Sequence, residues 1–255
     1  MRATVREPVR SLGVFFHLSI DTFRGIATWP FQHREFLDQC WFIVRVSLVP
    51  TLLVALPFTA LISFTFNILA AEFGASDVAG AGATLGAVTQ VGPVVTVLVV
   101  AGAGATAICA DLGSRTIREE IDALEVLGID PIVRLVAPRV LASTVVAVLL
   151  NALVCAIGIA GGFFFSVYFQ NVTPGAFVDG IPLLTGVPEL VISEIKAGAF
   201  GLIAGLVACY RGLTVKGGPK GVGQAVNETV VYAFMALFFV NIALTAIGIK
   251  MTAGS

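Results

Sequence analysis

The sequence predicts an all-α, polytopic membrane protein with about five transmembrane helices, an N-terminal amphipathic interfacial helix and a charged helix between the second and third spans. Hydrophobic residues make up 57% of the 255 residues and charged residues only 12%, with a mean hydropathy of +0.97. Soluble domains carry roughly 25% charged residues. The composition therefore excludes a soluble enzyme, and a net charge of −1 offers no basic field to a nucleic acid.

Long stretches without charged residues locate the predicted spans, because a membrane-crossing helix needs about 20 apolar residues. The spans are expected at about 44–70, 88–111, 139–168, 189–210 and 229–250. A Gly/Ala-rich run at 79–87 and Pro93 predict an irregular start to the second span. Pro174 and Gly175 predict that the third helix ends near Gln170 and is followed by an outer connection.

The distribution of positive charge predicts the orientation. Thirteen of the fifteen Lys and Arg residues lie before the first span, between spans two and three, or between spans four and five. Positive residues favour the cytoplasmic side of a membrane. We therefore expect a multi-pass protein of the plasma (inner) membrane, with its N-terminus in the cytoplasm and its C-terminus outside.

The segment before the first span has helical rather than span-like periodicity. Apolar residues recur on one face and alternate with His17, Asp21 and Arg24; they are Leu12, Phe15, Phe16, Ile20, Phe23 and Ile26. This pattern predicts a helix lying on the inner leaflet, and the alternative is a cytosolic helix packed on the rest of the protein. Residues 1–43 would form the cytoplasmic N-terminus with this helix, and 44–255 the transmembrane domain.

The sequence contains no recognisable catalytic or metal-binding set. Both histidines, His17 and His33, lie in the N-terminal segment, and no cysteine pair has CxxC spacing. The loop at 212–218 resembles a phosphate-binding loop but lacks the terminal Lys-Ser/Thr. We expect no enzymatic activity, no metal and no cofactor in this chain, so that a partner or an ion gradient would supply any energy.

Three charged residues lie in the outer half of the fourth predicted span: Glu189, Glu194 and Lys196. Charges at this depth are costly and are typical of functional sites. Glu189 and Lys196 share a helix face, whereas Glu194 points elsewhere. Lys196 either extends to the outer headgroups or faces a polar cavity or a partner subunit. An ion-coupled carrier would use such groups, but carriers of that type have an internal repeat, and no clear one is found.

Small residues at GxxxG spacing predict close helix contacts in three places. The pairs are Gly82 with Gly86, Gly158 with Gly162, and Gly201 with Gly205.

The segment at 111–139 is the most charged part of the chain. Thr116 and Glu119 have capping-box spacing, and Gly128 is a stop signal, which predicts a short helix at 116–127. Ile117, Ile121 and Leu124 would form its apolar stripe, and the remaining positions carry Glu119, Glu120, Asp122 and Glu125. Such a helix is either a solvated connector or a docking helix for a cytosolic partner.

Several motifs resemble the MlaE/YrbE permease family, the membrane subunits of ABC-type lipid transporters that work with MCE (mammalian cell entry) proteins. The run EIDALEVLGIDP at 120–131 and PRVLA at 138–142 carry the closest resemblance. Asp111-Leu112-Gly113, Glu189-Leu190-Val191 with Ile195-Lys196, and the glycine-rich turn at 217–223 add to it. The similarity covers about 85–250.

The resemblance implies a permease subunit of an ATP-driven transporter, with 116–127 as the coupling helix. A pair of cytosolic ATPases would bind ATP and Mg, a second YrbE-type permease would complete a heterodimer as in actinobacterial Mce systems, and MCE proteins would sit outside. The lipid, whether fatty acid, mycolic-type lipid, phospholipid or sterol, would pass near Phe58, Phe64 and Phe66. The alternative for these three side chains is ordinary lipid contact or core packing. Ala103 occupies the position of an arginine found in many members. The alternatives are an ion-coupled secondary carrier and a membrane anchor of an envelope assembly.

Overall fold

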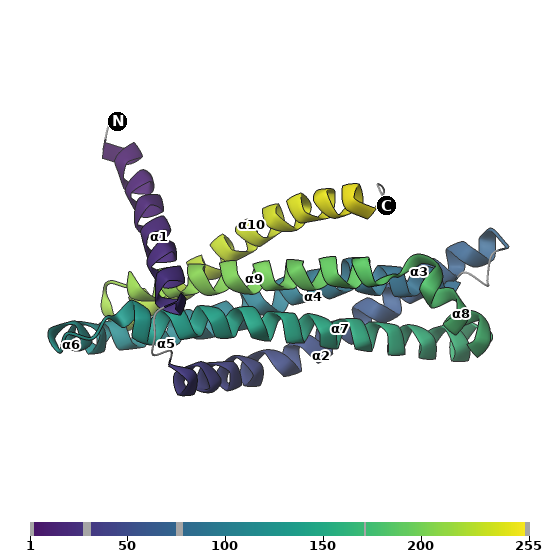
Figure 1. Ribbon diagram of the computed structural model, residues 1–255, viewed down its shortest axis with the longest axis horizontal. Coiled ribbons are helices and arrows are strands. Elements are labelled where there is room, and N and C mark those ends of the chain that lie inside the picture. Colours follow the sequence, from purple (N-terminus) through teal and green to yellow (C-terminus); the bar gives the residue numbers. More distant parts are fainter. Residues whose placement is uncertain (1–2, 28–31, 75–78, 171, 253–255) are drawn as a thin grey trace. The chain divides into compact units, whose positions relative to one another are not determined.

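The computed structural model describes residues 3–27, 32–74, 79–170 and 172–252, and within these ranges the chain is helical with no strand (Figure 1). The elements are α1 (Ala3–Ala27), α2 (His33–Glu72), α3 (Ala79–Gly86), η2 (Ala87–Val91), α4 (Gly92–Val99), η3 (Val100–Gly104), α5 (Ala105–Ile117), α6 (Glu120–Val126), η4 (Ile132–Val136), α7 (Ala137–Gln170), α8 (Pro174–Leu184), α9 (Val187–Leu213) and α10 (Gly218–Thr252). The three η elements are π-helical segments.

Five stretches of the described chain are long and apolar enough to cross a membrane, which confirms the predicted polytopic, all-α class. They are His33–Ala70, Gly80–Ile117, Ile132–Phe169, Val187–Leu213 and Gly218–Gly248. The helices of the first and last spans begin earlier than the predicted spans. Helix α2 starts at His33 and not at about 44, and α10 starts at Gly218 and not at about 229. Each helix continues through a polar segment before its uncharged stretch, because a helix does not end where the bilayer does.

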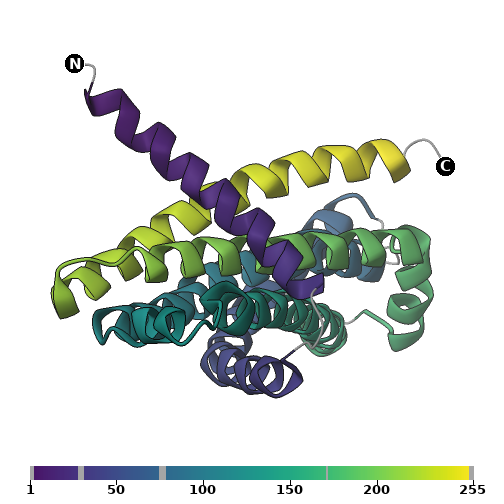
Figure 2. The same ribbon diagram turned by 60° about the vertical axis from the view of Figure 1, so that its left-hand side comes forward.

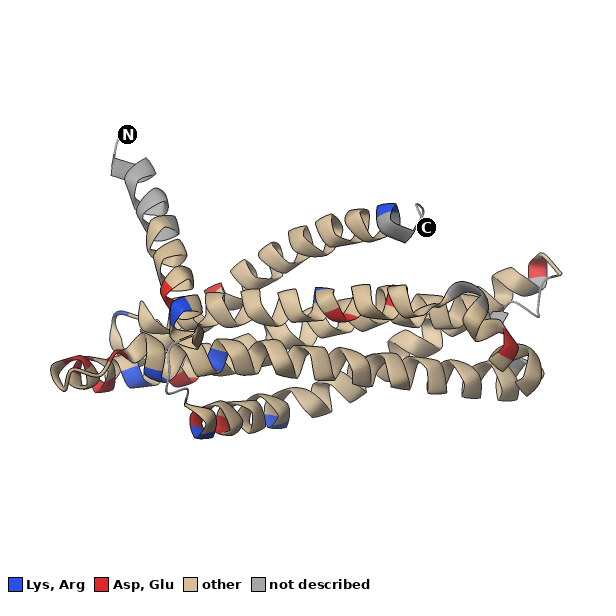
Figure 3. Cartoon of the chain, in the orientation of Figure 1, with Lys and Arg blue, Asp and Glu red and all other residues tan. Residues whose placement is uncertain are grey.

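The chain divides into two compact units, and α2, α7, α9 and α10 contribute residues to both. The first unit comprises 1–46, 100–146 and 201–236; the second comprises 47–99, 147–200 and 237–255. Thirteen of the fifteen Lys and Arg residues belong to the first unit. Within it, charged residues gather on α5, α6 and the start of α2 (Figure 3).

In the first unit, α1 crosses the last turns of α9 (Figure 2). The rings of Phe15 and Tyr210 meet edge to face with centroids 5.6 Å apart. Near the other end of α1, Gly25 lies so close to α7 that an added Cβ would stand 3.3 Å from the Cβ of Ala137. Thus α1 packs on the protein along one side, while Phe16 and Ile20 remain exposed. Its placement on the inner leaflet stays a prediction.

Close helix contacts occur at all three predicted glycine pairs. A Cβ on Gly82 or on Gly86 would lie 2.8 Å from a side-chain carbon of α2, and one on Gly158 would lie 2.7 Å from the Cβ of Ala87. In the first unit, the Ser143 hydroxyl donates a 2.8 Å hydrogen bond to the carbonyl of Gly201. These contacts require small residues, so the prediction of tight packing is confirmed.

Two regions differ from the sequence-based expectation. The run at 79–86 is the regular helix α3, whereas the irregular start predicted for the second span is present as the π-helical segment η2, directly before Gly92 and Pro93. The second π-helical segment, η3, was not predicted. The predicted outer connection after Gln170 contains the helix α8, which packs against α3. Thr173 caps it by accepting the amide of Ala176 at 3.4 Å, and Pro174 occupies its first position.

Candidate functional site

The acidic connector, residues 118–131, joins α5 to η4 through a sharp break. Helix α5 ends at Ile117, and Glu119 has a left-handed φ of +59° before α6 begins. The predicted capping box is therefore wrong. Thr116 lies in the last turn of α5, where its hydroxyl donates to the carbonyls of Leu112 and Gly212 at 2.9 and 3.1 Å. A hydroxyl inside a helix bonds back to the preceding turn instead of capping a new one.

The predicted apolar stripe of the connector faces the protein. Ile121 is only 8% exposed, and Ile117 and Leu124 are half-buried. The exposed apolar groups are instead at the tip, where Val126 is 88% and Leu127 is 73% exposed. The stripe that we expected to dock a partner thus anchors the connector. Gly128, with φ of +74°, ends α6 as predicted.

The acidic side chains surround this apolar tip. Glu119, Asp122 and Glu125 are exposed. Glu120 is half-buried, and the Nε of Arg118 lies 3.2 Å from its carboxylate. The connector therefore presents a small apolar tip framed by negative charge, a combination suited to a partner with an apolar groove and a basic rim.

A buried arginine holds the base of the connector. The side chain of Arg139, at the start of α7, has no exposed surface. Its Nη2 donates to Asp111 at 2.6 Å, its Nη1 donates to the carbonyl of Leu135 at 2.9 Å, and Glu35 lies 3.7 Å from Nη1. Gln39, one turn further along α2, donates to the same Glu35 oxygen at 2.9 Å. This Arg139 cluster ties α2, α5 and α7 together inside the first unit.

The cluster was not predicted, although both ends of its main ion pair stand in motifs that carry the family resemblance. Asp111 begins the Asp-Leu-Gly step, and Arg139 belongs to PRVLA. Their separation of 28 residues gives no local signal of contact. The sequence does indicate a contact of Asp111 with Arg115, four residues later on the same helix, and the Nε of Arg115 lies 3.4 Å from the carboxylate of Asp111.

A second polar site lies in the second unit, around Lys196 on α9. This lysine is only 5% exposed, and its Nζ donates to the hydroxyl of Thr245 on α10 at 2.9 Å. It lines a cavity of about 260 Å³ together with Gln90 and Glu189. Of the predicted alternatives for Lys196, the structure favours the polar cavity: the side chain points into this cavity and does not extend along the protein surface.

The two acidic residues of α9 have different surroundings. The carboxylate of Glu189 accepts the amide of Gly186 at 2.8 Å, which is the reciprocal half of a capping box at the helix start. Glu194 points elsewhere, as predicted, and accepts from the side-chain amide of Asn151 at 3.1 Å. Asn151 is fully buried and also donates to Ser193 at 3.0 Å. These bonds link α7 to α9 inside the second unit.

The three phenylalanines proposed to contact lipid are all partly exposed, with Phe58 at 39%, Phe64 at 47% and Phe66 at 37%. Two of them also have packing partners in the second unit. Phe64 meets Phe165 edge to face at 6.0 Å, and the ring of Phe66 covers Gly82 and Gly86. Phe66 therefore supports the packing of α3 on α2, and a role in lipid passage stays a prediction for all three.

Ala103 lies in the π-helical segment η3 and is half-buried. Its carbonyl accepts from the Thr106 hydroxyl at 3.0 Å. Single-turn π-helical segments inside α-helices are frequent at functional sites.

Five candidate spans, a charged connector between two of them and a buried lysine cavity define a multi-pass membrane protein of the permease type. The chain belongs to the permease MlaE family, whose profile matches residues 36–247. It is thus a permease subunit and not itself an ATPase.

Relatives with known names support this assignment. A probable ABC transporter permease protein of Synechocystis is 30% identical over 90% of this chain and 88% of its own length. The MlaE permease protein of the intermembrane phospholipid transport system of Haemophilus influenzae is 30% identical over 69% of this chain and 68% of its own. The chloroplastic protein TRIGALACTOSYLDIACYLGLYCEROL 1 of Arabidopsis thaliana is 32% identical over 62% of this chain and 45% of its own.

Proposed function

We propose that this chain is the transmembrane permease subunit of an ATP-driven lipid transporter, and that the acidic connector is where it meets the ATPase. The observation that carries the proposal is the connector's geometry in a member of this family. An exposed apolar tip, Val126 and Leu127, projects from a connector whose flanking helices α5 and α7 are joined by the fully buried Arg139. An exposed apolar projection framed by acids suits contact with a cytosolic motor.

The orientation follows from the charge of the first unit. We propose that this unit lies on the cytoplasmic side, because its excess of Lys and Arg favours that side; the connector and the N-terminus would then be inside the cell and the C-terminus outside. Two ATPase subunits, which bind ATP and Mg, would dock on the connectors of two permeases. MCE proteins would receive or deliver lipid at the outer face.

A second permease completes the proposed transporter. Large apolar side chains remain exposed along both α2 and α10, including Leu53 at 67% and Phe239 at 73%. Exposed apolar helix faces in a membrane meet lipid or another subunit. We propose that part of these faces pairs with a second YrbE-type permease in a heterodimer, and that the remainder borders the lipid path near Phe58 and Phe64.

The Lys196 cavity is the proposed contact for the lipid headgroup. Its buried ammonium group bonds to Thr245, and Gln90 is a further polar side chain in the same lining. An ammonium ion is a common ligand of phosphate and carboxylate groups. Either a phospholipid or a fatty acid fits this chemistry, whereas a sterol has no anionic group for it.

The experiment tests the connector by two classes of substitution. The double variant Val126→Ser, Leu127→Ser removes the apolar tip, and the double variant Asp122→Lys, Glu125→Lys reverses the surrounding charge. Because all four side chains are exposed, folding should be preserved. Both variants should lose the co-purifying ATPase and ATP-dependent lipid movement.

The matched control is Asp179→Lys, a charge reversal at an exposed position of α8 in the second unit. It should retain the ATPase and the transport. If both connector variants keep the ATPase and transport lipid normally, the connector is not the docking element. An ion-coupled carrier, or a protein that only anchors an assembly, would then account better for the chain.

A further inference from the structure

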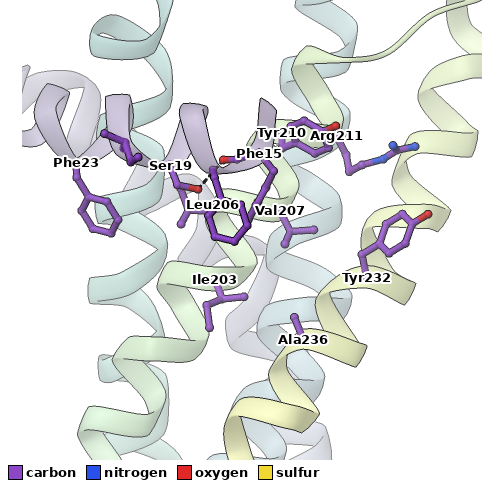
Figure 4. A pocket seen from close by; sticks show the side chains of 12 residues that line it. Phe15, Ser19, Phe23, Ile203, Leu206, Val207, Tyr210, Arg211, Tyr232 and Ala236 are labelled. Atoms are coloured by element: carbon purple, nitrogen blue, oxygen red, sulfur yellow. Dashed lines mark hydrogen bonds between the residues drawn. The ribbon is translucent and has the colours of Figure 1, made fainter. Parts of the chain in front are cut away.

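A pocket of about 780 Å³ lies in the first unit between α1, α9 and α10, and no residue of the connector lines it (Figure 4). Its volume is within the range of roughly 300–1,000 Å³ that small-molecule sites occupy. The helix α1 contributes Phe15, Phe16, Ile20 and Phe23 to the lining. No part of the proposed transport cycle uses this pocket.

The lining is apolar in its body and polar at one end. Figure 4 shows Tyr210, Arg211 and Tyr232 together at one end, with Ile203 and Ala236 at the other. Among the described residues of the lining, the one further polar side chain is Ser19, whose hydroxyl donates to the carbonyl of Phe15 on its own helix at 2.8 Å. An occupant therefore needs an apolar body and a single polar end.

The depth of the pocket matches one leaflet. Along α9 it extends from Arg211 to Ile203, which is about 12 Å at 1.5 Å per residue. Half of the hydrocarbon core of a bilayer is about 15 Å thick. The polar end lies at the charged side of the unit, where α9 ends at Leu213, and the apolar end extends toward the middle of the membrane. A membrane lipid has this distribution of polar and apolar groups.

The exposed face of α1 supports the same occupant. Phe16 is 62%, Ile20 52% and Phe23 48% exposed, at a spacing that puts all three on one side of the helix. All three line the pocket. Within a leaflet such side chains pack against acyl chains, so an acyl chain would fill the space between α1 and α9.

Arg211 supplies the polar contact. Its guanidinium forms an ion pair with Glu228 and lies 5.7 Å from the centre of the Tyr232 ring. Its Nε–H is buried and has no acceptor. A guanidinium group has more donors than one carboxylate can use, and phosphate oxygens match its planar geometry. Because the side chain of Arg211 is 25% exposed, the accessible donors of its guanidinium favour a phosphate at this end of the pocket.

We propose that this pocket holds one glycerophospholipid of the surrounding membrane, with an acyl chain between α1 and α9 and the phosphate at Arg211. This lipid stays with the permease and joins α1 to α9 and α10; it is not the transported molecule. The proposal depends on the membrane location of the chain and not on the direction or substrate of transport. A second copy of the chain is a poorer occupant, since an apolar helix face would offer no anionic group to Arg211 at the polar end of the pocket.

The test uses the full chain in membrane vesicles of phosphatidylethanolamine and phosphatidylglycerol that contain a trace of phosphatidylcholine with a diazirine in its acyl chain. After illumination, mass spectrometry locates the lipid adducts on the peptides. We expect adducts concentrated on the α1 peptide containing Phe16 and on the α9 peptide containing Ile203. Adducts spread evenly over the exposed faces of α2 and α10, with none enriched at the pocket, would overturn the proposal.

Two variants, Ala236→Trp on α10 and Ile20→Trp on α1, fill the pocket with a large side chain. The control is Ala243→Trp, the same substitution at an exposed position of α10 outside the pocket. The filling variants should lower the pocket adducts by about tenfold, because excluding about two methylene groups at about 0.8 kcal/mol each weakens binding by that factor. The control should leave them unchanged. Because labelling needs no ATP, its result is independent of whether transport is observed.

Discussion

Replacing the buried Arg139 by methionine should destabilise the permease strongly. The variant keeps most of the side-chain length and loses the 2.6 Å bond to Asp111, the bond to Leu135 and the weaker contact with Glu35. Hydrogen bonds of a charged group contribute about 1.5–3 kcal/mol each, so the bonds to Asp111 and Leu135 together contribute at least about 3 kcal/mol. Glu35 adds little, since its side chain is 27% exposed and 3.7 Å away.

The expected loss of unfolding free energy is therefore about 3 kcal/mol, or about a hundredfold in the unfolding equilibrium. SDS titration of the purified protein in mixed micelles, followed by circular dichroism, measures it. In an Asp111→Asn background, the same substitution should cost about 1–2 kcal/mol less, because no unpaired carboxylate remains. The exposed Arg45→Met is the matched control and should have no effect. A loss below about 1 kcal/mol, or an equal loss in both backgrounds, would refute the assigned role of the cluster.

Three further predictions concern other parts of the chain. Glu119→Gly should raise stability by about 0.5–1 kcal/mol in the same titration, since glycine adopts the φ of +59° without strain; a decrease would contradict the left-handed turn. Gly158→Ala should lower the free energy of unfolding by about 1–3 kcal/mol, because the added Cβ would lie 2.7 Å from the Cβ of Ala87. Gly102 has no heavy atom within 4 Å of an added Cβ, so Gly102→Ala should not lower it, and equal losses in the two variants would argue against the helix contact. Lys196→Gln should keep the fold and the ATPase but lower ATP-dependent phospholipid transfer by about ten- to a hundredfold, the loss expected for one charge-assisted bond; unchanged transfer would remove the lysine from the lipid path.

The helical membrane fold was predictable because its signals are local. Each span is a run of apolar residues long enough to recognise, and the stop at Gly128 and the bend near Pro174 depend on single residues. Helix ends were less predictable. The polar turns at the start of α2 and α10 remain helical, and α8 is short and is capped by Thr173.

The candidate site was predictable in its composition and not in its contacts. The acidic residues of the connector and the buried lysine were both visible in the sequence. The face of α6 that packs on the protein depends on the break at Glu119, which moved the helix start to Glu120. Ile121, expected in the apolar stripe of a docking helix, is therefore buried, and the exposed apolar side chains are those of Val126 and Leu127. The Arg139–Asp111 pair joins residues 28 apart through tertiary packing, so no periodicity could indicate it.

The measurement that tests the account most directly is the identification of the proteins that co-purify with this chain from its native membrane in mild detergent. Mass spectrometry should find a P-loop ATPase, a second permease and MCE proteins with the unaltered chain. The ATPase should be lost selectively from the Val126→Ser, Leu127→Ser variant. Recovery of the unaltered chain without any ATPase, under conditions that keep other ABC complexes intact, would contradict the assignment of this chain as an ATP-driven permease subunit.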